Sequence, residues 1–377
     1  MTHKKIFLLA LVFSVLTGFK SYVYGYDITK QLSLDVSIAG TYQYLDYDSE
    51  DNDDSLGRGA IAADIGFNLH PTDIDEFQVT LSYASGNSLH DKSPFILASY
   101  ADDLEDDVED INGRSRDYLL EAWYKHTFNL TEDISLSGTI GIIDSTGYLD
   151  ENEFANDELS QFMNEVFVNN PLLNLPSYDS GGVVELSYKN FYLKALAMDS
   201  KTDKWETPDE NDTKSYNYYG GEIGCSLNTP LGEGNYRVIG YITSEEFEGW
   251  DNSEEKYQGM GISADQKIGE IFGVFFRFGW QDDDAIVDFD TMYSGGININ
   301  GKLWGREDDE IGIGYAYLDG CDDADVDNTQ VVEGYVKFKV TEFSHVSLDV
   351  QYMNDDYEGD IDDTEGVISS VRYVIEF

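Results

Sequence analysis

Charged and aromatic residues recur at alternate positions in many short stretches of this chain. In the stretch 119–128 (LLEAWYKHTF), Glu121, Trp123 and Lys125 share one side of an extended strand, because side chains alternate with period two. Carboxylate and ammonium groups beside an indole ring can hydrogen-bond polar solutes and water, while the ring offers a flat apolar face. The chemistry that this surface supports is the binding of solutes.

Histidines are few and scattered. The five are His3, His70, His90, His126 and His345, and the sequence shows no Ser/His/Asp grouping and no metal-ligand pair. We therefore expect no enzyme activity, no cofactor and no metal centre. The formal net charge of -51 and the lack of a basic stripe also argue against nucleic-acid binding.

Sixteen segments of alternating apolar and polar residues must position these side chains. In the last of them, Val371, Tyr373 and Phe377 share one face, whereas Arg372 and Glu376 lie on the other. An apolar face toward lipid and a polar face toward a lumen is typical of a membrane barrel strand. The predicted strands are 31–47, 58–70, 76–84, 117–128, 134–143, 182–189, 191–198, 215–227, 235–243, 256–268, 271–280, 292–303, 310–318, 329–340, 345–353 and 366–377.

The connections between these segments alternate in length. One set is short, such as 129–132, 189–190 and 269–270, and the other is long, with the first at about 47–57. Short turns on one side and long loops on the other predict an all-β fold, a transmembrane antiparallel β-barrel of 16 strands in the bacterial outer membrane. The alternative is a secreted multi-domain β protein, whose apolar faces would be hidden in a core.

The first residues have the features of a secretory signal. Lys4 and Lys5 precede an apolar core at 6–17, so we predict a signal peptide at 1–25 and a barrel at 26–377. No later segment approaches the run of about 20 apolar residues that a membrane-spanning helix requires. Tyrosines near the predicted strand ends, such as Tyr42 and Tyr315, are expected at the lipid interface.

Strand parity predicts which charged and aromatic residues face the lumen. Opposed basic and acidic groups there would order water and set up a field across the pore. The alternative is that these charges pair along the wall and stiffen it. The predicted pore-lining residues on strands are Arg58, Glu121, Trp123, Lys125, Glu185, Lys194, Arg237, Arg277, Glu333, Lys337 and Arg372.

The third long connection, at about 144–181, differs from the others. Its middle lacks strand alternation, and apolar residues from Leu159 to Phe167 fall at helical spacing. We expect an amphipathic helix over 156–167, in a loop that folds inward, buries its apolar stripe in the barrel and narrows the pore. A helix lying over the barrel rim is the alternative. The predicted constriction residues are Asn156, Asp157, Glu158 and Gln161.

Acidic residues concentrate in the long connections. Stretches such as 102–110, 282–284 and 322–327 place negative charge at one end of the predicted barrel, which favours cations and neutral solutes over anions. Asp323, Asp325 and Asp327 have calcium-loop spacing, but Asn328 stands where that loop needs glycine. Divalent cations could bind these acidic loops, or the loops could form a solvated acidic surface.

The stretch 150–164 (DENEFANDELSQFMN), followed by Asn169-Asn170-Pro171, resembles the signature region of the carbohydrate-selective porins, the OprB-like family. The resemblance is dense in this stretch and is architectural elsewhere. It implies a sixteen-stranded outer-membrane barrel with inward-folded loops, through which small sugars such as glucose diffuse passively. Partners would be sugars in transit and outer-membrane lipid, with a homotrimer as one possible assembly. A general cation-preferring porin and a surface adhesion or structural barrel are the alternatives.

Overall fold

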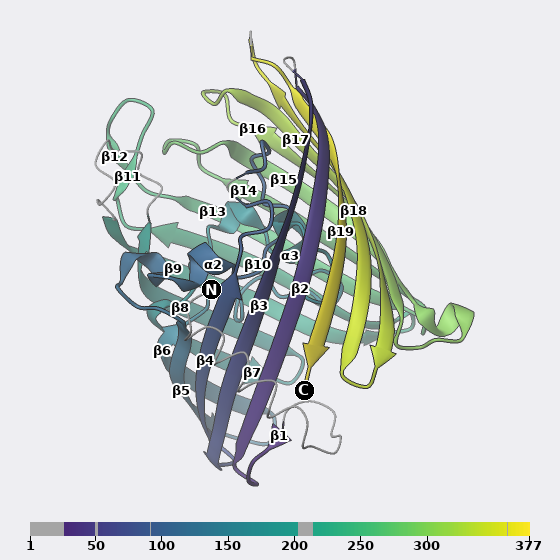
Figure 1. The fold of residues 1–377 in the computed structure, drawn as a ribbon. Coiled ribbons are helices and arrows are strands. Elements are labelled where there is room, and N and C mark those ends of the chain that lie inside the picture. The colour runs from purple at the N-terminus through teal and green to yellow at the C-terminus, as the bar shows by residue number, and fades with distance from the viewer. Residues whose placement is uncertain (1–25, 50–51, 91, 203–213, 360) are drawn as a thin grey trace.

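The computed structural model describes residues 26–49, 52–90, 92–202, 214–359 and 361–377. The predicted signal peptide at 1–25 lies outside the described residues. Sixteen long antiparallel strands form a closed barrel, in which β2 (Leu32–Ser49) pairs with β19 (Thr364–Glu376) along a ladder from Asp48–Glu365 to Ser37–Glu376 (Figure 1). Closure pairs each of the sixteen long strands with a neighbour on both sides, so none of them presents an open sheet edge along its described ladder.

The strands follow one another in chain order around the barrel. Each pairs with its sequence neighbours, and the closure between β2 and β19 is the only long-range pairing among the sixteen described long strands. The other fourteen are β3 (Asn52–Thr72), β4 (Asp75–Ser85), β5 (Leu119–Asn129), β6 (Ile134–Ile143), β7 (Asp179–Tyr188), β8 (Phe191–Thr202), β9 (Lys214–Thr229), β10 (Gly232–Thr243), β13 (Gln258–Ile268), β14 (Phe272–Gln281), β15 (Phe289–Asn300), β16 (Glu310–Gly320), β17 (Val326–Thr341) and β18 (Ser344–Tyr357).

The two faces of the wall differ as the sequence predicts. On β19, Val371 and Tyr373 are about two-fifths exposed, whereas Arg372 and Val374 are 0% exposed. Outward positions on the other strands carry the same kind of exposed apolar side chain, Tyr42 and Tyr315 included. An apolar outer band and a polar inner face suit a wall between lipid and a lumen.

The fold prediction is confirmed in strand number and class, whereas several strand ends differ from the predicted ones. β2 and β3 continue beyond the predicted ends and pair as far as Ser49 and Asn52, so the long loop expected at 47–57 is a hairpin extension. The backbone hydrogen bonds between two strands can continue without an apolar face. The alternation of side chains therefore did not predict this extension of β2 and β3. β15 ends at Asn300, whose side chain accepts a hydrogen bond from Lys302 and caps the 3-10 helix η3 (Gly301–Trp304).

Short elements lie mainly in the long connections. They are β1 (Tyr26–Asp27), α2 (Glu105–Val108), η1 (Ile111–Gly113), α3 (Glu165–Val168), η2 (Pro171–Leu173), β11 (Phe247–Glu248) and β12 (Glu254–Glu255). Over the residues described above, no helix has the length and apolar character needed to cross a membrane.

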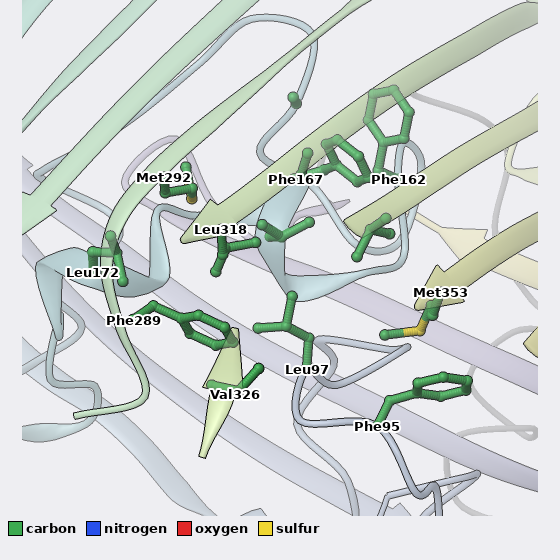
Figure 2. Packing of buried hydrophobic residues seen from close by; sticks show 14 of the residues in the cluster. Phe95, Leu97, Phe162, Phe167, Leu172, Phe289, Met292, Leu318, Val326 and Met353 are labelled. Atoms are coloured by element: carbon green, nitrogen blue, oxygen red, sulfur yellow. The ribbon is translucent and has the colours of Figure 1, made fainter. Parts of the chain in front are cut away.

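The main apolar cluster lies inside the barrel. Two connections supply much of it: the second loop (residues 86–118, between β4 and β5) and the third loop (residues 144–178, between β6 and β7). Figure 2 shows Phe162 and Phe167 of the third loop side by side, and Phe95 and Leu97 of the second loop in the same cluster as Met353 of β18. The barrel interior is therefore partly filled by its own loops.

Candidate functional site

Arg277 on β14 fastens the third loop to the inner wall. Its guanidinium is completely buried and lies 3.0 Å from the buried carboxylate of Asp150. It also donates hydrogen bonds to the backbone oxygens of Phe167 (2.7 Å), Asp150 (2.9 Å) and Val168 (3.2 Å). One side chain thus joins two parts of the loop, and the planar guanidinium is suited to such multiple contacts.

A second attachment lies on β17 and β19. The carboxylate of Glu333 accepts the backbone N–H groups of Met163 and Asn164, and Arg372 donates to the backbone oxygens of Glu158 and Gln161. Arg372 and Glu333 are both 0% exposed. These inward charges bind loop backbone that would otherwise be buried without partners.

Glycines on the wall let the loop approach closely. A Cβ at Gly273 would lie 2.3 Å from the Phe154 ring, and one at Gly314 would lie 2.8 Å from the Phe167 ring. Contacts under 3.0 Å force a displacement. The rings of Phe154 and Phe167 therefore fit against the wall only because Gly273 and Gly314 have no side chain.

The helix expected over 156–167 is wrong. Asp157 instead caps a turn by accepting the N–H groups of Leu159 and Ser160, and the chain forms only the four-residue α3, capped by Asn164. The apolar side chains of Phe162 and Phe167 are buried, but against the wall and each other and not along one helix face. Hydrogen bonds to wall residues replace the intrahelical ladder.

A row of cations continues the contact toward β8. Lys194 donates to Glu151 (2.8 Å) and to the backbone oxygen of Tyr148 (2.6 Å), while Lys267 lies 3.0 Å from Glu153. Arg237 pairs with Asp265 at 2.8 Å within the wall. The third loop therefore follows the inner face from β8 to β19.

The wall of β5 to β7 keeps its polar side chains partly exposed. Glu121 accepts hydrogen bonds from the Trp123 indole N–H (3.2 Å) and from Thr80 (3.2 Å). Lys125 and Glu185 form an ion pair at 2.9 Å, and their side chains are 28% and 20% exposed. Trp123 is half-buried. This group combines an indole ring, two carboxylates and an ammonium on one accessible stretch of the inner wall.

Tyr148 of the third loop faces this wall. Burial raises the pKa of the Tyr148 phenol, and the carboxylates of Glu121 and Glu185 raise it further, so the phenol lies within electrostatic reach of both. The phenol remains a neutral donor. Tyr148 and Trp123 pack against the same buried apolar cluster, so this part of the third loop lies against the wall of β5 to β7.

The predicted site residues divide into distinct groups. Arg277, Glu333 and Arg372 hold the loop, and Arg237 and Lys194 are more than nine-tenths buried. Glu121, Trp123, Lys125 and Glu185 form the partly exposed group. Arg58 is exposed, and in the described contacts it donates only to the backbone oxygen of its neighbour Gly57. Lys337 lies 3.6 Å from Glu310. The four predicted constriction residues are half-buried on the third loop: Asn156, Asp157, Glu158 and Gln161.

Sequence reasoning missed the second loop. Tyr100 donates to Asp102 at 2.6 Å, and Tyr178 donates to Asp103 at 2.5 Å. Burial raises the pKa of Asp102 to about 7, with the charge of Asp64 as the next cause. The signal was present: apolar residues interrupt the acidic run of this loop, and Leu104 and other members of it are fully buried.

Comparisons with known proteins agree with this architecture. A family model described as the carbohydrate-selective porin, OprB family, matches residues 73–355. An uncharacterized protein of Aquifex aeolicus (strain VF5) is 35% identical over 285 residues, which covers 74% of this chain and 79% of that protein. The structure of Pseudomonas putida OprB at high pH superposes with a TM-score of 0.69 at 17% identity, covering 92% of this chain and 94% of that one. The outer-membrane channel DcaP of Acinetobacter baumannii gives a TM-score of 0.52 at 11% identity, over 94% and 100% of the two chains.

Proposed function

The chain belongs to the OprB family of carbohydrate-selective porins, and from this we propose that small sugars pass between its third loop and the wall of β5 to β7. It is an outer-membrane porin through which small carbohydrates diffuse passively. The family and the fold are those of channels. The proposal concerns the path and the residues that recognise the sugar.

One observation carries this proposal: Trp123 stands among hydrogen-bonding groups on the accessible part of the wall. Its indole N–H is already bonded to Glu121, which fixes the ring, and the Lys125–Glu185 pair follows on the same wall. A pyranose offers an apolar ring face for stacking and hydroxyls for carboxylates and ammonium groups. Aromatic rings with a few fixed polar groups are the usual composition of small-molecule sites.

Neutral sugars fit this surface better than anionic ones. The three lysines described along this path are paired, as Lys125–Glu185, Lys194–Glu151 and Lys267–Glu153, so none of them is a surplus positive charge that would attract an anion. Exposed acidic residues of other long loops, such as Asp322, Asp323 and Asp325, add a negative potential at their end of the barrel. We infer a neutral sugar, of glucose-like size, as the preferred solute.

A second candidate function is a general cation-preferring porin with no sugar site. It is supported by the net charge of -51, which acts on any solute. Divalent cations at the acidic loops and a homotrimer built through lipid-facing residues stay predictions. A surface adhesion or structural barrel is the third candidate, and it would carry no current.

Planar-bilayer recording separates these candidates. We expect an ion current that falls as glucose is added at millimolar concentration, with a cation-preferring reversal potential in a salt gradient. A current that sugar leaves unchanged would favour the general porin. A barrel that inserts without conducting would refute both channel proposals.

A further inference from the structure

A histidine and two aspartates of the second loop lie close together, outside the surface assigned to sugars. The Nδ1 atom of His90 is 3.5 Å from a carboxylate oxygen of Asp106, and one ligand atom from each of His90, Asp106 and Asp107 lies within 4.8 Å of the others. All three side chains are exposed. Within the described ranges, no other group of three or more such residues meets this spacing.

The chain holds the two halves of this cluster against each other. His90 belongs to a turn in which its N–H donates to the backbone oxygen of Asn87 at 2.8 Å. The Asn87 side chain accepts the Asp106 N–H at 3.2 Å, and the Glu105 carboxylate accepts the Gly86 N–H at 2.6 Å. These bonds tie the turn to α2.

Buried neighbours and a local bond limit the motion of both halves. Leu89 and Leu104, next to His90 and at the start of α2, are 0% exposed. Asp107 points back along the helix, because one of its oxygens accepts the Leu104 N–H at 2.9 Å. The backbone beneath the three side chains is thus fixed, while the side chains themselves are accessible to an ion from solution.

We propose that His90, Asp106 and Asp107 form a binding site for a divalent transition-metal ion of the zinc type. One imidazole nitrogen and two carboxylate oxygens are ligands that zinc uses, at about 2.0–2.2 Å, with water completing the shell. Tetrahedral bonds of that length set ligand atoms roughly 3.3–3.5 Å apart. The His90–Asp106 distance already meets this value, and Asp107 has a ligand atom within 4.8 Å of both, so a small shift of its carboxylate supplies the third ligand.

The imidazole distinguishes this site from the other acidic loop stretches. Carboxylates alone suit calcium and magnesium, which prefer oxygen ligands, whereas imidazole suits zinc, copper and nickel. Binding of calcium to the chain should therefore be indifferent to His90, and binding of zinc should depend on it.

An ion at this site would act on the electrostatics of the lumen. Asp102 and Asp103 precede this cluster on the same loop, and the charge of Asp107 contributes, after burial, to the raised pKa of Asp103. A bound divalent cation offsets part of that negative charge. The site would link metal in the medium to the cation preference of the channel, independently of any sugar site.

Calorimetric titration of the folded, detergent-solubilised chain with zinc and, separately, calcium tests the proposal. His90→Ala should weaken the tightest zinc binding by about tenfold or more, since loss of groups that merely support a ligand already costs about 10–100-fold. His70→Ala is the matched control: His70 is also exposed and has one carboxylate, Glu76, at 4.0 Å. Calcium binding should be the same in all three proteins.

Equal zinc binding by wild type and His90→Ala would overturn the proposal and indicate nonspecific binding to acidic loops. Asp106→Asn provides a second variant if His90→Ala does not fold, and it should lose affinity in the same way. In bilayers, zinc added to the long-loop side should reduce the cation preference of wild type and of His70→Ala. A similar reduction in His90→Ala would place the ion elsewhere.

Discussion

Replacing Arg277 by methionine should release the third loop from the inner wall. The substitution keeps most of the side-chain volume but removes the positive charge and all the hydrogen bonds that this guanidinium donates to Asp150, Phe167 and Val168. Asp150, 0% exposed, is then left with a buried carboxylate whose counter-ion at 3.0 Å is gone. Its remaining described bond is from the Asn170 N–H at 2.8 Å.

The expected cost is large because the pair is fully buried. Removing one partner of a buried ion pair costs about 3–5 kcal/mol. A change of about 1.4 kcal/mol shifts an equilibrium tenfold, so the docked loop should lose a factor of roughly 10² to 4 × 10³ relative to undocked states. The barrel ladder between β14 and its neighbours involves backbone groups and should persist.

Single-channel conductance is the assay, with circular dichroism to show that the barrel remains folded. Arg277→Met should conduct more than wild type and with more current noise, because the loop leaves the lumen wider. Arg58→Met is the matched control. Arg58 also faces inward but contacts no loop in the described bonds. The conductance of the Arg58→Met channel should therefore change little. The double variant Arg277→Met/Asp150→Asn should recover part of the wild-type value, since it removes the uncompensated charge. Wild-type conductance in a folded Arg277→Met channel would refute the anchoring role.

Four further predictions concern packing, pH and charge. Gly273→Ala should destabilise the loop by about 1–3 kcal/mol through overpacking against Phe154, seen as increased conductance, whereas Gly240→Ala, whose Cβ has no atom nearer than 3.9 Å, should not. The cation preference of the channel should rise as pH passes through about 7, because the raised pKa of Asp102 places the ionisation of its carboxyl there. Asp102→Asn should remove this rise. The same shift means that the stability of the fold falls as pH rises from 3.8 toward about 7, because the unfolded chain loses the Asp102 proton at lower pH than the folded chain does. Thermal melts at several pH values will measure this fall in stability. Reversal potentials should show cation preference that weakens at high salt as the acidic loops are screened, and anion preference would contradict the electrostatic argument.

Period-two alternation was sufficient to predict the barrel. On a lipid-facing wall each outward side chain is selected by its own surroundings, so Val371, Tyr373 and their counterparts report the fold locally. Strand ends beyond the membrane carry no such constraint, which is why the β2–β3 extension was missed. The inward direction of Arg277 and Arg372 was predicted for the same local reason.

The packing of the loops could not be predicted in the same way. Which inward charges are covered depends on contacts over 110 to 214 positions in sequence, such as Arg277 with Phe167 and Arg372 with Glu158. The apolar residues Phe162 and Phe167 gave helical spacing, yet tertiary contacts with Phe275 decide their conformation. Acidic composition hid the buried Leu104 of the second loop.

The central claim is that sugars pass along the wall that carries Trp123. Its most direct test is the fall of ion current with increasing glucose, compared among wild type, Trp123→Ala and Trp280→Ala. Trp280 is the same residue type on the outer face, 39% exposed, so its loss leaves the lumen intact. We predict that the glucose concentration for half block rises in Trp123→Ala and stays at the wild-type value in Trp280→Ala. Equal half-block concentrations in all three channels would contradict the account.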